Sequence, residues 1–413
     1  KPHFGRRVPF SKGHNPSPWL EMIHLEEDGL PSSYPAKPGE NGRWSLCPEN
    51  AGSKKYNVHF IHTPMMLADK QGNTPAIMDE GGLIYVLHEE EAAIRKNNDL
   101  KFPLVVRSNI YDCVDWMLTS EWDDDDFSNF HASKVNTHWH FLQFDNQSSD
   151  GVITGFSNEQ SVRPFTMLEK KTDKGLPLPL NTTFTKAAKK GERVITVKNA
   201  AQYHPEIEIL IGADNVGGNE VGRIKSIKGN EITLVRPLKN DHPVKDIVTV
   251  EFVRQRFWVD SDVGTVFWHD HALGRITWGH GGFGTMIVEP VGSTYHNPKT
   301  GAPIRSGPLA DIRTAEPVGY GVNGSFRELL VQLNDSVPHT INIVTAGNPP
   351  GQPVEVALEA GKTISFPIPD HIKMTPMPFL NGGTHTTGGS LNFRAEPISG
   401  RLKANPDPSK LFS

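Results

Sequence analysis

The chain has little cysteine, no long apolar run and little net charge, and each shortage excludes a class of protein. Its 413 residues include 2 cysteines, Cys47 and Cys113, which is too few for a disulfide-rich scaffold. One disulfide between them and two free thiols both fit the sequence. No stretch approaches the roughly 18 apolar residues of a membrane span. A net charge of −5 argues against nucleic acid or an anionic membrane as the main partner.

Glycine and proline are abundant, with 38 and 33 residues, so many turns are expected and β structure is favoured over helix bundles. Apolar and polar residues alternate in several short segments, as they do in half-buried strands. We predict strands over residues 56–62, 83–88, 102–107 and 113–118, and a short helix within 89–98. The fold class expected from these segments is all-β.

Changes in pattern along the chain predict four parts. Residues 1–53 are rich in proline, glycine and charge and form an extended lead-in. Residues 184–252 contain short alternating strands and predict a small β module. We interpret it as an insertion that splits one larger β domain, formed by residues 54–183 and 253–292. Residues 293–413 predict a second β segment with a turn-rich tail.

Two His-x-His pairs stand out among the 18 histidines: His138-Trp139-His140 and His269-Asp270-His271. On a strand, residues i and i+2 share one face about 6.5–7 Å apart. This spacing suits two neighbouring metal ions, or one ion where the strand bends. Imidazole binds zinc, copper, iron and nickel, so the ligand type does not choose among them. Because aromatic residues flank both pairs, we expect four imidazoles to converge between apolar walls.

The surroundings of both pairs resemble the motifs of the multicopper oxidase family, over about residues 54–165 and 252–292. The matching segments are His138-Trp139-His140 with the later Asp150-Gly151, Glu159-Gln160-Ser161-Val162-Arg163-Pro164, and Trp268-His269-Asp270-His271 with Gly282-Phe283-Gly284 and Pro290. One departure is Phe141, which follows His-Trp-His where the family usually has glycine.

The resemblance implies a cupredoxin-like Greek-key β-barrel or sandwich, with the small module inserted and a second, partial cupredoxin-like segment after it. By the same resemblance, His138 would bind the type 2 copper, and His140, His269 and His271 would bind the type 3 pair. Asp150 would supply protons as O₂ is reduced to water. An extracellular, cell-surface or periplasmic location is implied in the same way.

The chain supplies only half of the histidines that a trinuclear cluster of this family takes. The family's His-x-x-His-x-His and His-Cys-His motifs are absent, and neither cysteine is flanked as a type 1 copper ligand would be. We therefore expect a partner chain that carries these motifs and the type 1 copper. The sequence also lacks an apolar signal segment and has abrupt ends, so we expect a subunit or processed part of a larger oxidase.

Several alternatives stay open at this stage. The four consecutive aspartates at residues 123–126 fit either a solvated loop or a hard-cation site. If they form a cation site, Mn²⁺ is favoured as the substrate of the oxidase over Fe²⁺ or phenols. The rival to an oxidase is a non-catalytic cupredoxin-like copper carrier or surface assembly protein. His280 fits a loop residue or a hydrogen-bond donor to a ligand. His59 and His62 are expected on opposite strand faces.

Overall fold

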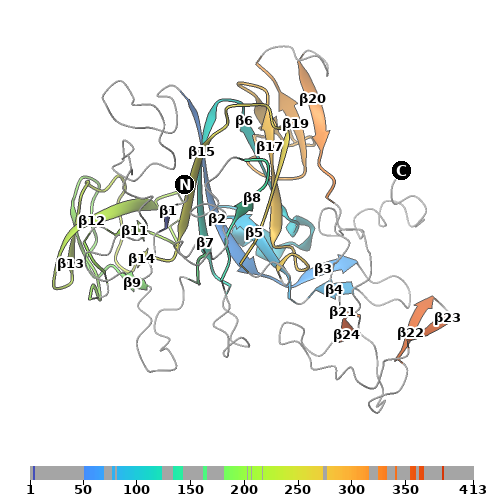
Figure 1. The fold of residues 1–413 in the computed structure, drawn as a ribbon, viewed down its shortest axis with the longest axis horizontal. Coiled ribbons are helices and arrows are strands. Elements are labelled where there is room, and N and C mark those ends of the chain that lie inside the picture. Colours follow the sequence, from blue (N-terminus) through green and yellow to red (C-terminus); the bar gives the residue numbers. More distant parts are fainter. Residues whose placement is uncertain are drawn as a thin grey trace.

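A computed structural model gives the fold (Figure 1). It describes residues 3–4, 51–68, 77–79, 81–122, 134–142, 161–164, 181–201, 203–205, 207–215, 217–272, 277–315, 324–332, 340–341, 354–359, 362–366 and 384–385. Within these ranges the chain is nearly all β, which confirms the predicted class.

One short α-helix, α1 (Glu91–Lys96), and one 3-10 turn, η2 (Asn98–Leu100), interrupt the strands of the described part. Helix α1 has Glu91 in its first turn and Arg95 in its last, and both charges complement the helix dipole. No helix among the described residues is long and apolar enough to cross a membrane.

Two sheets form the centre of the molecule. The first has the strand order β1-β15-β7-β2-β5, with β1 (His3–Phe4), β15 (Val253–Trp258), β7 (Asp112–Ser120), β2 (Gly52–His62) and β5 (Leu83–Leu87). The second has the order β6-β17-β16-β8, with β6 (Leu104–Asn109), β17 (Phe283–Glu289), β16 (Thr265–His269) and β8 (His138–Trp139). Each sheet contains one parallel pair, β2 with β7 and β6 with β17.

Both sheets contribute side chains to one apolar core, which makes them a β-sandwich. Alternate residues of β2, Tyr56, Val58 and Phe60, point into this core together with Trp116 of β7 and Trp268 of β16. Alternation of this kind puts one face of each strand inside and the other outside. The mixed parallel and antiparallel sandwich is consistent with the cupredoxin-like fold expected from the sequence.

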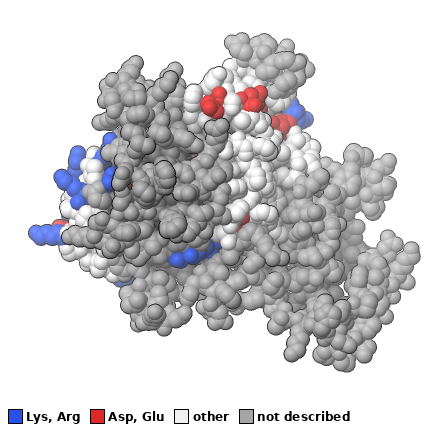
Figure 2. Space-filling model, viewed as in Figure 1, with Lys and Arg blue, Asp and Glu red and all other residues white. Residues whose placement is uncertain are grey.

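A third sheet with its own core lies at one side of the sandwich (Figure 1). Its order is β10-β13-β12-β11-β14-β9, with β10 (Val194–Thr196), β13 (Glu231–Leu234), β12 (Glu220–Lys228), β11 (Glu208–Ile211), β14 (Ile247–Thr249) and β9 (Asn181–Thr183). Met117 of β7 packs with Leu210 and Phe252 where this sheet meets the sandwich. On the face shown in Figure 2, Lys and Arg side chains gather at the β12–β13 edge.

Smaller sheets complete the described part. They are β18 (Thr294–His296), β19 (Leu309–Arg313) and β20 (Ser325–Leu329); β3 (Met65–Ala68), β4 (Ile77–Asp79), β21 (Thr340–Ile341) and β24 (Thr384–His385); and the hairpin β22 (Val354–Glu359) with β23 (Lys362–Phe366). The lead-in contributes β1, which pairs with β15. The exact borders of the four predicted parts stay predictions.

Cys113 lies buried on β7 and is disulfide-bonded, and the chain has one other cysteine, Cys47. We therefore expect a thiol assay to detect no free thiol in the denatured, unreduced protein and two free thiols in the reduced protein. Cys113→Ser should lower the unfolding free energy by about 2–4 kcal/mol, because a cross-link restricts the unfolded chain. Two thiols before reduction, with unchanged stability of the variant, would contradict the disulfide.

Candidate metal centre

The two His-x-His pairs lie on neighbouring antiparallel strands. Strand β8 pairs with β16 so that His138 faces His269 and Trp139 faces Trp268. Paired residues of an antiparallel ladder lie on the same face, and adjacent residues lie on opposite faces. The histidines therefore gather on one side of the sheet, while both tryptophans point into the sandwich core.

The tryptophans anchor the histidine-bearing strands. The ring centroids of Trp116, Trp139 and Trp268 lie 4.8–5.0 Å apart, at tilted or edge-to-face angles. Gly284, opposite Trp268 on β17, is required for this packing because a Cβ there would lie 2.2 Å from the Trp268 ring. The Gly-Phe-Gly segment of the sequence is therefore explained by close packing behind His269.

Side-chain hydrogen bonds hold the segment before His138 in place. Such bonds matter because β8 has only two residues and makes few ladder hydrogen bonds of its own. Trp139 Nε1 donates to Gln255 Oε1 at 2.7 Å, and Gln255 Nε2 donates to the Thr137 carbonyl at 3.0 Å. Tyr85 OH donates to the Asn136 carbonyl at 2.5 Å. These bonds tie the first His-x-His pair to strands β15 and β5 of the first sheet.

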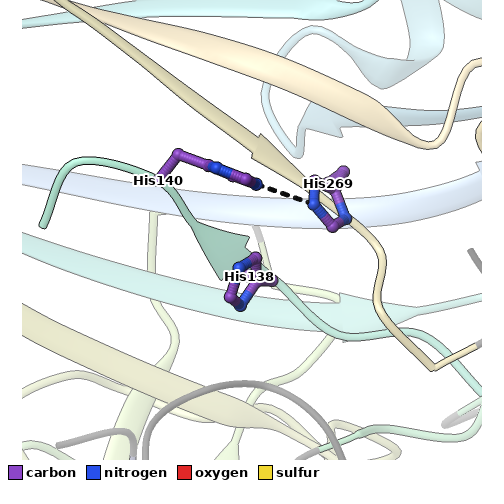
Figure 3. A group of neighbouring side chains, drawn as sticks. All are labelled: His138, His140 and His269. Atoms are coloured by element: carbon purple, nitrogen blue, oxygen red, sulfur yellow. Dashed lines mark hydrogen bonds between the residues drawn. The ribbon is translucent and has the colours of Figure 1, made fainter. Parts of the chain in front are cut away.

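Three of the four predicted ligands converge closely (Figure 3). His138, His140 and His269 each offer a ring nitrogen, and these atoms lie within 4.8 Å of one another. His140 Nε2 and His269 Nε2 lie 2.9 Å apart. The ring of His271 lies 4.8 Å from that of His138 and 5.4 Å from that of His269. The four imidazoles predicted to converge are therefore neighbours.

The convergence differs from that of a flat strand. The rings within each pair are 4.9 and 5.4 Å apart, closer than the spacing of i and i+2 on an extended strand. Strand β8 ends at Trp139 and β16 ends at His269, so His140 and His271 lie just beyond the strand ends. The 2.9 Å contact joins histidines of different pairs, His140 and His269, and the sequence spacing does not reveal it.

His269 is held ready to bind a cation. Its Nδ1 lies 3.0 Å from the Asp270 carbonyl, to which it donates, and this leaves the Nε2 lone pair directed at His140. Burial, with smaller effects from the neighbouring histidines, lowers the pKa of His269 to about 4. The ring is therefore neutral at physiological pH, as a metal ligand must be.

The 2.9 Å between His140 Nε2 and His269 Nε2 is a hydrogen-bonding distance between the two rings. Metal–imidazole bonds of about 2.0–2.1 Å would put two nitrogens about 2.9 Å apart at a right angle and about 3.3 Å apart at the tetrahedral angle. One ion could therefore replace this hydrogen bond with little movement of the rings. Imidazole nitrogens at this separation suit copper, nickel or zinc.

Asp270, between the two histidines of the second pair, joins both ligand segments. Its buried carboxylate accepts hydrogen bonds from Asn136 N at 3.0 Å, Ala272 N at 3.1 Å and Thr277 Oγ1 at 2.7 Å. Asn136 Oδ1 in turn accepts from His271 N at 2.7 Å. Sequence reasoning did not assign Asp270 a role, although a charged residue two positions after the core-facing Trp268 was a usable signal.

The other predicted positions have different outcomes. Asp150 and the aspartates at 123–126 lie outside the described residues, so their roles stay predictions. His280 is buried and pairs with Asp79, with 2.8 Å between Nδ1 and Oδ1. Phe141 has φ 62°, a left-handed conformation that favours glycine. Glycine is the residue that usually follows His-Trp-His in the motif that this segment resembles.

No protein-family model and no curated protein matches the chain. Among solved structures, a multi-copper oxidase from Pseudomonas thermotolerans aligns at 12% identity over 58% of this chain and 30% of its own, with a TM-score of 0.23. Another multicopper oxidase aligns at 13% identity over 65% and 99%, with a TM-score of 0.18. The tailspike of Pseudomonas phage phi297 aligns at 16% identity over 18% and 14%, with a TM-score of 0.15.

This chain thus spans about a third of the length of the first of these oxidases. TM-scores this low do not establish a shared fold, so the function is argued from the geometry of the histidines.

Proposed function

We propose that the chain binds copper through His138, His140, His269 and His271 and contributes half of the trinuclear cluster of a multicopper oxidase. The observation that carries this proposal is the 2.9 Å between His140 Nε2 and His269 Nε2, with His138 and His271 beside them. His138 is assigned to the type 2 ion and the other three to the type 3 pair. Bound copper would supply one-electron redox chemistry.

In the proposed reaction, four one-electron oxidations of substrate supply the electrons that, with four protons, convert O₂ into two waters. The chain's own residues would position the metal, and burial keeps the His269 imidazole neutral. Asp150 is the proposed proton donor to oxygen. A partner chain would hold the type 1 copper that accepts electrons from substrate and would also supply the missing histidines.

Exposed groups beside the histidines support a partner on this side. His271 is exposed, and the aromatic side chains of Phe141 and Trp278 are 75% and 42% exposed. Partly exposed ligands beside exposed aromatic rings suit a surface that a second chain completes. Mn²⁺ is the favoured substrate and phenols are the alternative, and both belong to the partner's type 1 site. An extracellular, cell-surface or periplasmic location goes with this proposal.

Copper analysis of the native preparation tests the proposal. About three or more coppers per chain, with O₂ uptake on addition of Mn²⁺ or a phenol, are expected when the partner is present. His269→Ala should lose copper and abolish O₂ uptake, whereas His204→Ala, at an exposed position between β10 and β11, should retain both. One copper or none in the wild type would contradict the oxidase.

The alternative is a non-catalytic copper carrier or surface assembly protein, and the same histidines would serve it. It predicts copper that depends on His269, no O₂ uptake with any reductant, and no blue absorption in the native preparation.

A further inference from the structure

A second cluster of ligand-type side chains lies away from the four histidines. His59 of β2, His88 just after β5, and Glu91 at the start of α1 each offer one atom, and these atoms lie within 4.8 Å of one another. His59 lies between Val58 and Phe60, which face the sandwich core, so it points to the opposite face of the sheet. Helix α1 covers that face, where Ile94 packs against Ile61.

Arg95 orients two carboxylates toward His59. It binds Glu91 Oε1 at 2.7 Å and Glu121 Oε2 at 3.1 Å. The other oxygen of each carboxylate faces His59 Nδ1, at 2.9 Å from Glu91 Oε2 and 3.7 Å from Glu121 Oε1. A group that fixes the outer oxygens of carboxylates in this way is typical of the surroundings of metal ligands.

An ion-pair network alone does not explain the position of His88. Its Nδ1 is buried and has no hydrogen-bond partner among the described residues, while its ring stacks on His59 with centroids 3.8 Å apart. A buried polar atom without a partner is unfavourable and requires an explanation.

We propose that His59, His88, Glu91 and Glu121 form a second metal site, which binds Zn²⁺ and ties helix α1 to strands β2, β5 and β7. Two imidazoles and two carboxylates, with no thiolate, are a ligand set that Zn²⁺ accepts as a closed tetrahedral site. Ligand atoms on a tetrahedral Zn²⁺ are about 3.3 Å apart, so the cluster, whose atoms lie within 4.8 Å of one another, would contract around the ion. The site is independent of the copper proposal and shares no residue with it.

Co²⁺, a visible-absorbing substitute for Zn²⁺, tests this site in the full chain. The titration is done in a His269→Ala background, which silences the four-histidine cluster. We expect one equivalent of Co²⁺ with tetrahedral d–d absorption, displaced by Zn²⁺, and a higher melting temperature with Zn²⁺. His88→Phe keeps a ring to stack on His59 but removes the ligand atom, so the equivalent should be lost. His62→Phe, at an exposed position of the same strand, should retain it.

Equal Co²⁺ binding by the His88→Phe and His62→Phe variants would overturn the proposal, as would a background protein that binds no Co²⁺. The melting temperature of each metal-free variant shows whether it is folded. Should His88→Phe not fold, Glu121→Gln takes its place, because the amide preserves the size of the side chain and removes a ligand charge. It should weaken Co²⁺ binding at least about 10-fold, and unchanged affinity would count against the site.

Discussion

Asp270→Ala should weaken copper binding by about 10–100-fold and lower the unfolding free energy by about 3–5 kcal/mol. The carboxylate is fully buried and accepts hydrogen bonds from Asn136, Ala272 and Thr277, so its removal leaves three donors without an acceptor. Because these donors belong to both ligand segments, both His-x-His pairs lose their support at once. Copper affinity by competition with a chelator and stability by chemical denaturation measure the two effects.

Two matched variants separate positioning from general damage. Asp270→Asn keeps the size and one acceptor oxygen, so it should recover most of the stability and part of the copper affinity. Asp260→Ala removes an exposed carboxylate that follows β15 and should change neither quantity. If Asp270→Ala bound copper as tightly as the wild type, Asp270 would not be a positioning residue for the histidines.

His242→Ala should destabilise the third sheet, of order β10-β13-β12-β11-β14-β9, by about 3–5 kcal/mol. The substitution leaves two buried carboxylates without their cation. His242 is fully buried, with Nδ1 2.7 Å from Asp246 Oδ2 and Nε2 3.1 Å from Glu220 Oε1. Its ring stacks on Phe184, with centroids 5.5 Å apart. Asp241→Asn, which removes the charge from an exposed ion pair with Lys189, should leave the stability nearly unchanged.

The same residue should make the stability of this sheet depend on pH. Burial alone would lower the pKa of His242, but the hydrogen bonds to Asp246 and Glu220 outweigh burial and raise it to about 9. Protonated His242 therefore stabilises the fold. This stabilisation is complete below the unfolded-state pKa of about 6.5, and it is lost as the pH rises toward the folded-state pKa of about 9. Denaturation at pH 6 and pH 9 should therefore differ by roughly 2–3 kcal/mol in the wild type.

In His242→Ala this difference should disappear. A variant that kept the wild-type pH dependence would show that another group titrates in this range and that the His242 pair does not cause it.

Local pattern was sufficient for the strand content and for the choice of ligands. The segments at residues 56–62, 83–88, 102–107 and 113–118 correspond to β2, β5, β6 and β7 to within a few residues. Strands β5 and β6 are buried along their whole length, so short apolar runs rather than alternation marked them. The short helix predicted within 89–98 is α1. The two His-x-His pairs were visible because i and i+2 share a strand face.

The sequence by itself determined that the chain is all-β and that His138, His140, His269 and His271 are the histidines to examine. It did not determine which of them meet. The 2.9 Å between His140 and His269 depends on the register of β8 against β16, and the role of Asp270 depends on the loop that brings Asn136 to it. His88 and Glu91 likewise join His59 only because α1 folds over the outer face of β2. Pairing across strands far apart in sequence is set by the packing of whole sheets, so only the tertiary structure decided these contacts.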